Sequence, residues 1–97
     1  MDTLILPKQV ELATADILYL QSDSNYTYIY RRSKRRHLLV ALSLCKIQDD
    51  LSHKQFVRVN RSNLVNIRFV KSYETRNKYV KLILSNGQVF TTSRRRT

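Results

Sequence analysis

Short runs in which apolar and polar residues alternate dominate this sequence and constrain its fold more than any other feature. Tyr26–Tyr30, Phe69–Tyr73 and Tyr79–Leu84 follow this alternation and are rich in aromatic or β-branched residues. Successive side chains of a β-strand point to opposite faces, so a strand with one buried face has this period. The pattern predicts a mostly β fold with little helix.

Turn signals separate these runs into hairpins. Ser33–Arg35 is predicted to turn the chain from Tyr26–Tyr30 into Leu38–Val40, which makes a hairpin with a basic tip. Asn86–Gly87 is a strong two-residue hairpin signal, and Asp16 is expected to cap the turn before the strand that follows it. The other strands are predicted at Thr3–Leu6, Gln9–Leu12, Ile17–Leu20, Phe56–Val59, Leu64–Ile67 and from Val89 onward.

One helix is predicted, over Leu42–Leu51. Leu44, Ile47 and Leu51 follow the i, i+3, i+7 spacing of a buried helical face, while the polar residues between them face away. Cys45 is the one cysteine of the chain and lies in this apolar run, so we expect a small buried hydrophobic side chain and a reducing cytoplasm.

The length of 97 residues predicts a single domain, residues 1–97, with one modest core. No apolar run approaches the roughly 20 residues that cross a bilayer, and the first residues lack the basic flank of a secretion signal. We therefore expect a cytoplasmic domain with no membrane partner.

The net charge of +11 comes from 18 basic and 7 acidic residues, and it is unevenly distributed. Residues 1–30 hold one basic and four acidic residues, whereas residues 31–97 hold 17 basic and three acidic ones. A solubilising surface would interleave both signs, and a membrane-surface protein would need a basic amphipathic helix. The charge favours a nucleic-acid partner, provided that folding brings together its three basic clusters. These are Arg31, Arg32, Lys34, Arg35 and Arg36; Arg58 and Arg61; and Arg94, Arg95 and Arg96.

The segment Phe56–Asn66 combines apolar anchors with side chains that read nucleic acids. Arginine fits the two major-groove acceptors of guanine, asparagine fits adenine, and serine can bond a phosphate. Arg61 is therefore a candidate base contact. Asparagine is also common as a turn cap, and for Asn66 we favour that structural role.

These residues resemble the LytTR-type DNA-binding domains, the output halves of many bacterial response regulators. The family pattern contains an Ile-rich strand leading into an Asn-Tyr turn, a short helix, a Phe-x-Arg-x-His-Arg-Ser-x-x-Val-Asn block, a late Asn-Gly hairpin and a Ser-Arg-Arg ending. Asn60 stands here where the family often has histidine. The corresponding segments are Asp16–Tyr30, Leu42–Leu51, Phe56–Asn66, Asn86–Gly87 and Ser93–Arg96.

The resemblance implies an elongated all-β stack of short antiparallel strands in about three small sheets with one short helix. Its connecting loops would enter successive major grooves of double-stranded DNA and bend the duplex. Thr27 would lie nearest a base in the first loop, Arg61 would make the central contact and Arg95 the third. The other expected contacts are Asn25, Tyr26, Arg58, Asn60, Ser62, Asn63, Arg94 and Arg96, with Lys34, Arg35 and Arg36 on the DNA backbone at the edge of the site.

The resemblance also implies a transcription regulator or the output module of one. Relatives often bind direct repeats in pairs, so a homodimer on DNA is an expected partner arrangement. With no receiver region in the sequence, a lone module should bind weakly or cooperate only on DNA.

An enzyme, a cofactor, a metal site and a small-molecule substrate are not expected. His37 and His53 have no acid or cysteine at metal-ligand spacing, and both are expected at the surface.

The alternative is an RNA-binding or ribosome-associated basic β module. It would expose Tyr26, Tyr28 and Tyr30 as a stacking platform for bases. Three tyrosines on one strand face more often pack against a core, which is the arrangement we expect here. An interaction module that uses a sheet edge would not need so high a charge.

Overall fold

The computed structural model describes residues 2–93, which form ten short strands and one α-helix, α1 (Leu44–Asp49). Each predicted strand is present, and most boundaries move by only one or two residues. Three short 3-10 turns, η1 (Pro7–Gln9), η2 (Thr14–Asp16) and η3 (Ile67–Phe69), connect strands. The strands are β1 (Thr3–Leu6), β2 (Val10–Ala13), β3 (Ile17–Asp23), β4 (Tyr26–Arg31), β5 (Leu38–Val40), β6 (Phe56–Asn60), β7 (Asn63–Asn66), β8 (Val70–Thr75), β9 (Tyr79–Leu84) and β10 (Val89–Ser93).

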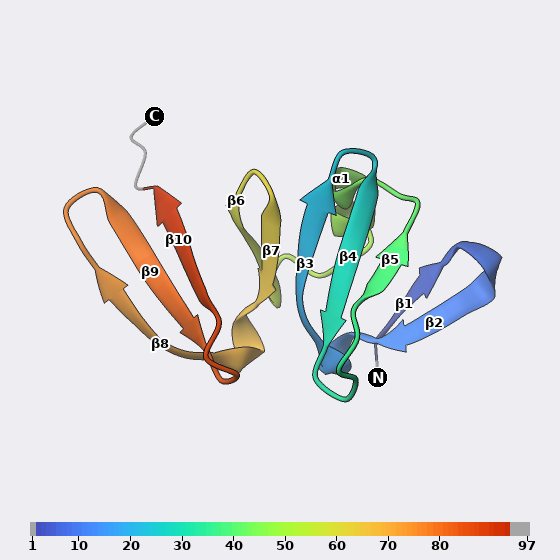
Figure 1. Ribbon diagram of the computed structural model, residues 1–97, viewed down its shortest axis with the longest axis horizontal. Coiled ribbons are helices and arrows are strands. Elements are labelled where there is room, and N and C mark those ends of the chain that lie inside the picture. The colour runs from blue at the N-terminus through green and yellow to red at the C-terminus, as the bar shows by residue number, and fades with distance from the viewer. Residues whose placement is uncertain (1, 94–97) are drawn as a thin grey trace.

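The strands form three antiparallel sheets side by side (Figure 1), as predicted. A small sheet pairs β1 with β2, the central sheet has the order β5-β4-β3-β7-β6, and the third has the order β10-β9-β8. The molecule is elongated, with extents of 44 × 27 × 23 Å. Within the described part of the chain, no helix is both long and apolar enough to cross a membrane.

Strand β3 lies in the middle of the central sheet and is buried on both faces. Ile17 and Leu20 belong to a core cluster with α1, while Leu18 and Tyr19 belong to a second cluster shared with the third sheet. A shift in register between Ile17 and Tyr19 interrupts the strict alternation. The central sheet is thereby attached to a helix on one side and to a second sheet on the other.

The helix lies within the predicted range Leu42–Leu51 but is shorter at both ends; Leu44 and Ile47 on it, and Leu51 just after it, are buried in the core cluster with the central sheet, as predicted. Ser43 caps its first turn, because its hydroxyl oxygen accepts a hydrogen bond from the backbone N–H of Lys46. The expectation that Cys45 is buried is wrong: its side chain is exposed. Consecutive helical residues are turned by about 100°, so the neighbour of a buried leucine can face solvent.

Of the three tyrosines of β4, Tyr30 packs against the second core cluster and stacks on Tyr19 with ring centroids 4.3 Å apart, as predicted, whereas Tyr26 and Tyr28 belong to neither core cluster, which corrects the prediction for them. The fully buried side chains are Thr27 and Ile29, whereas Tyr26 is 49% exposed and Tyr28 and Tyr30 are half-buried on the other face. Threonine and isoleucine are the smaller side chains, and they fit the space beneath the helix. The period of the strand is as predicted, but the fully buried face is the one with Thr27 and Ile29.

Asp16 acts at a longer range than predicted. Its carboxylate accepts hydrogen bonds from the backbone N–H of Ser33, at 2.9 Å, and from the Ser33 hydroxyl. The backbone N–H of Arg32 donates to the carbonyl of Asp16 at 2.7 Å. Asp16 therefore anchors the loop between β4 and β5.

Candidate nucleic-acid interface

Two hairpin turns and the end of β10 lie along one edge of the molecule (Figure 1). We call this the turn edge and define it by the β3–β4 turn at residues 24–25, the β6–β7 turn at residues 61–62, and Ser93. Consecutive strands alternate in direction, so the turns β3–β4 and β6–β7 emerge on the same side of the central sheet. Two of the three segments that were predicted to contact DNA are thus brought together.

The side chain of Asn60 stabilises the β6–β7 turn through hydrogen bonds. Its side-chain oxygen accepts from the backbone N–H of Ser62 at 2.9 Å and from the Asn63 amide at 3.1 Å. Its own amide donates to the carbonyl of Thr91 at 3.3 Å, which ties the turn to β10. Asn60 therefore uses its side-chain oxygen and amide within the protein, as asparagine does in turns, whereas the buried side-chain oxygen of Asn63 has no hydrogen-bond partner among the described residues.

Arg58 also holds this turn in place through hydrogen bonds. Its guanidinium donates to the carbonyls of Asn60, at 3.1 Å, and Arg61, at 2.7 Å, and to the side-chain oxygen of Gln48. Gln48 lies on α1, so the turn is held against the helix. Arg58 was predicted to contact DNA directly, but these bonds commit its guanidinium to positioning the turn.

Arg61 and Ser62, at the tip, remain exposed. Within the described residues, the Arg61 guanidinium makes no hydrogen bond, whereas its backbone carbonyl is held by Arg58. A fixed backbone with an unbonded arginine fork suits recognition of a guanine edge or a phosphate. The turn carries the clearest candidate base contact of the described residues.

The β3–β4 turn lies beside it. The backbone N–H of Ser22 donates to the carbonyl of Ser62 at 2.8 Å, and Gln21 pairs with Asn63 across β3 and β7. Ser24 adopts a positive φ of 60°, which lets the chain reverse over residues 24–25. The two turns form one surface.

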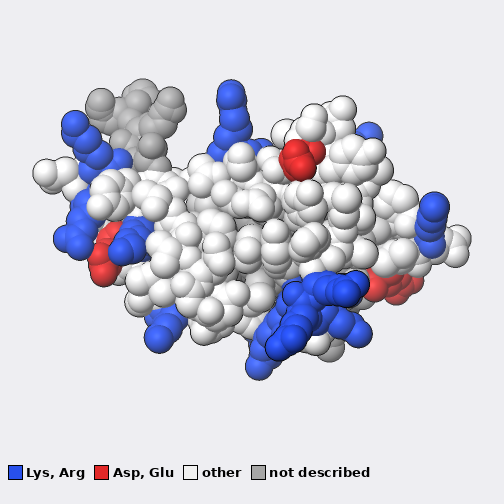
Figure 2. All heavy atoms as spheres, viewed as in Figure 1, with Lys and Arg blue, Asp and Glu red and all other residues white. Residues whose placement is uncertain are grey.

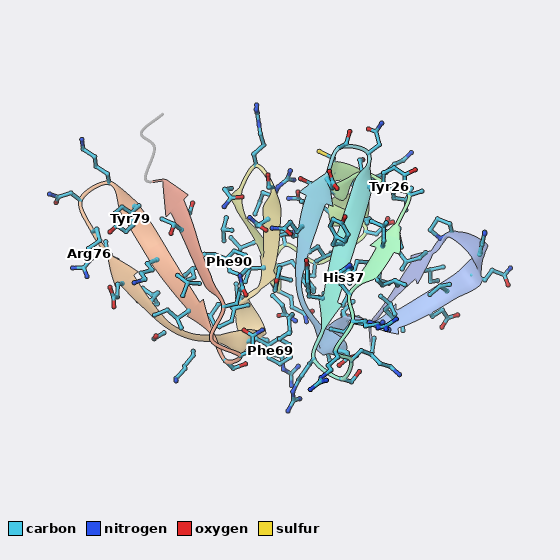
Figure 3. The ribbon with its side chains drawn as sticks, in the orientation of Figure 1. Tyr26, His37, Phe69, Arg76, Tyr79 and Phe90 are labelled. Carbon is cyan, nitrogen blue, oxygen red and sulfur yellow. The ribbon has the colours of Figure 1, made fainter. Side chains whose placement is uncertain are left out.

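The side chains of the first turn divide between solvent and core. Asn25 and Tyr26 are exposed at the turn edge (Figure 3), as a contact with DNA requires. Thr27, which was expected nearest a base, is fully buried and its hydroxyl donates to the carbonyl of Leu42 at 2.8 Å. In this conformation its side chain cannot reach a base, so we assign Thr27 a structural role.

An acidic side chain also lies at this edge. The Tyr28 hydroxyl donates to the carboxylate of Asp23 at 3.3 Å. The negative charge of Asp23 is the main cause that raises the pKa of Tyr28. The turn edge is therefore not uniformly basic.

Strand β10 reaches the turn edge from the third sheet. Phe90 packs edge-on against Tyr19 with ring centroids 4.8 Å apart, which attaches β10 to the central sheet (Figure 3). The predicted contacts Arg94, Arg95 and Arg96 lie outside the described residues.

The loop between β4 and β5, residues 32–37, lies at the opposite edge. Lys34, Arg35 and Arg36 are exposed there, and Figure 2 shows Lys and Arg side chains gathered into one patch over that end of the central sheet. The structure therefore does not bring this cluster together with Arg58 and Arg61. Its contact at the margin of the same site is not supported by the geometry.

Sequence reasoning could not identify two partners that organise the site. Gln48 lies ten positions from Arg58, and Leu42 lies 15 positions from Thr27. No local sequence pattern predicts either contact. Asn66, in contrast, is fully buried, caps η3 by accepting from the N–H of Arg68 at 3.0 Å, and confirms the structural role that we favoured.

The comparisons with known proteins agree with this arrangement. A solved LytTr DNA-binding domain from Bacillus cereus, described as part of a methyl-accepting/DNA response regulator, has a similar fold with a TM-score of 0.76. It is 21% identical, and the match covers 95% of this chain and 84% of that one, so the likeness is one of fold. The CO-responsive transcriptional regulator RcoM of Rhodospirillum rubrum is 28% identical over 74 residues.

That match covers 76% of this chain but 30% of RcoM, so the chain spans less than a third of that relative's length. The family model described as the LytTr DNA-binding domain matches residues 8–97, which include the β3–β4 turn, the β6–β7 turn and the arginines that follow β10. Because this match extends over nearly the whole sequence and the three-sheet fold agrees with it, the chain belongs to the LytTr DNA-binding domain family.

Proposed function

We propose that this protein binds double-stranded DNA in a sequence-specific manner through the turn edge and acts as the output module of a transcription regulator. The observation that carries the proposal is the β6–β7 turn, where Arg58 and Asn60 hold the backbone while the Arg61 guanidinium is exposed and unbonded among the described residues. A rigid turn limits the entropy that is lost when an arginine docks on a base.

The spacing of the two turns suits one major groove. The order β4-β3-β7-β6 separates their centres by two strand spacings, or roughly 10 Å, which is close to the roughly 12 Å width of the groove. Arg61 would contact a base edge, Asn25 and Tyr26 would contact a neighbouring base or phosphate, and Ser62 a phosphate. Arg94, Arg95 and Arg96 follow β10 and would extend the contact along the duplex, with Arg95 as a second base reader.

The proposal includes the finer points of function. The domain folds as one unit over residues 1–97, works in the cytoplasm, needs no cofactor and has no catalytic role. Pairs of domains bind direct repeats, so that a homodimer assembles on DNA. The names of its relatives support a role in transcription, and the DNA-binding family leaves the RNA-binding alternative without support.

Selection from a random duplex library tests this function. The purified protein is used at about 150 mM salt, where contacts with phosphates alone are weakened. Enrichment of a motif, found once or as a direct repeat, is expected. Absence of any motif, together with equal or tighter binding of single-stranded RNA, would contradict the proposal.

A further inference from the structure

Five basic residues lie at the end of β4 and on the loop that follows it, away from the turn edge. They are Arg31, Arg32, Lys34, Arg35 and Arg36, and we call them the basic loop. Strand β4 has six residues and rises about 3.3 Å per residue, so the basic loop lies roughly 20 Å from the β3–β4 turn. The body of the central sheet separates the two edges (Figure 1). A duplex that docks on the turn edge leaves the basic loop facing solvent.

The loop is held in place by the protein. Asp16 bonds the backbone and hydroxyl of Ser33, so the one carboxylate that anchors the loop is already engaged by polar groups. The guanidinium of Arg32 lies 5.8 Å from the centre of the Phe69 ring, on the third sheet side (Figure 3), and this contact orients its charge.

A groove of about 240 Å³ lies between the basic loop and the β9–β10 turn. Its basic and polar lining is Arg31, Arg32, Lys34, Arg35 and Asn86, and Leu18, Tyr19 and Tyr30 line it as well. The Arg31 Nε is buried and has no hydrogen-bond partner among the described residues. The groove therefore offers several donors and positive charges to an anionic group, with Arg32 also in contact with the Phe69 ring.

The character of this surface favours a nucleic acid over an acidic protein. Interfaces between proteins have an apolar centre, whereas those with DNA are polar and strongly positive. Residues 31–37 contain no aliphatic or phenyl side chain, and residues 32–37 are all exposed. A row of exposed arginines matches a repeating phosphate backbone, and it carries no arrangement of anchored side chains that would read bases.

We infer that the basic loop is a second DNA-binding surface, which holds the phosphate backbone of another duplex while the turn edge holds the first. The inference rests on the proposed function, since it requires the turn edge to bind the first duplex. Each molecule then bridges two segments of DNA, one chosen by sequence and the other by charge alone.

Capture of two duplexes tests the inference. The selected duplex is fixed to beads, saturated with protein and washed, and a labelled duplex of unrelated sequence is then added. The test variant is Lys34→Gln, Arg35→Gln, Arg36→Gln. The control is Lys8→Gln, Lys54→Gln, Lys78→Gln, which removes the same charge from exposed sites elsewhere. All replaced side chains are exposed, and thermal unfolding verifies that both variants fold.

The wild type and the control are expected to retain the labelled duplex. The test variant should retain roughly tenfold less, while its binding to the bead-bound duplex changes by less than about twofold. For the second duplex, the plot of log binding constant against log salt concentration should also become shallower by about two to three units, because each lost phosphate contact reduces the slope by about 0.9.

Other outcomes separate the two claims. If the wild type does not bind the fixed duplex in preference to a scrambled one, the proposed function fails and the inference falls with it. If the first duplex binds but the second is not retained, or is retained equally by the test variant, only the inference is overturned. If the wild type retains labelled poly-glutamate but not the second duplex, the inference is also overturned, and the surface is assigned to an acidic protein.

Discussion

At the scale of single residues, the candidate site contains side chains that are available to contact DNA and side chains that hold others in place. Arg58 and Arg61 are three positions apart and chemically identical, yet one guanidinium is bonded to the turn and the other is unbonded among the described residues. Thr27 and Asn25 differ in the same way. Residue type alone therefore does not decide whether a side chain is available to contact DNA. The number of hydrogen bonds that it makes within the protein does.

Replacement of Thr27 by valine distinguishes a structural role from contact with a base. Thr27→Val keeps the shape but leaves the carbonyl of Leu42 without its 2.8 Å hydrogen bond. We expect the free energy of unfolding to fall by about 1 to 2 kcal/mol and the affinity of the folded protein for its selected duplex to stay within about twofold. Chemical denaturation and DNA titration measure these effects. A large loss of affinity with unchanged stability would show that Thr27 contacts DNA and contradict its structural role.

Tyr19 predicts how stability depends on pH. Burial, with a smaller contribution from the charge of the neighbouring Tyr30, raises the pKa of Tyr19 from 10.0 to about 12. The unfolded chain then loses this proton near pH 10 while the native protein retains it. The stabilising contribution is complete below pH 10 and is lost as the pH rises through about 12.

The comparison of the wild type with Tyr19→Phe isolates this effect. Between about pH 9 and about pH 12, the unfolding free energy of the wild type should fall by roughly 2 kcal/mol more than that of the variant. Urea denaturation at a series of pH values measures the difference. Parallel curves for the two proteins would show that the Tyr19 hydroxyl is not held in its neutral form.

At the scale of elements, the alternation of residues predicts the strands well because a half-buried strand needs a period of two. It does not decide which of the two faces is buried. In β4 the tyrosines supply the larger apolar area, but Thr27 enters the core because Leu42 accepts its hydroxyl hydrogen bond. That carbonyl belongs to a segment 15 residues away, so the local sequence cannot reveal it.

In the proposed function, recognition depends most on the β6–β7 turn, and Arg58→Lys tests how Arg58 holds this turn in place. A lysine has one ammonium group and cannot bond the two carbonyls and Gln48 in the fork geometry of arginine. We expect a loss of about 1 kcal/mol in binding the selected duplex, with a smaller loss for a scrambled one. Arg68→Lys is the matched control, because Arg68 is exposed away from the turn. Equal effects of the two substitutions would contradict the bracing role.

At the scale of the whole molecule, the two basic clusters that lie within the described residues, Arg31–Arg36 and Arg58 with Arg61, do not converge on one surface. The strand order partly explains this, since consecutive antiparallel strands connect at alternate ends. The β3–β4 turn and the loop between β4 and β5 must therefore face opposite edges, which the predicted hairpins already implied. The pairing of β7 with β3, which sets the two turns side by side, is a long-range contact and could not be predicted from local pattern.

The most direct test of the central claim is the affinity of the wild type and of Arg61→Ala for the selected duplex and for a scrambled duplex. If the β6–β7 turn reads sequence, Arg61→Ala loses about 1 to 3 kcal/mol on the selected duplex, much less on the scrambled one, and relaxes the preference at one base pair. If the substitution weakens binding of both duplexes by the same amount, Arg61 contacts only phosphate, and the assignment of sequence recognition to this turn is wrong.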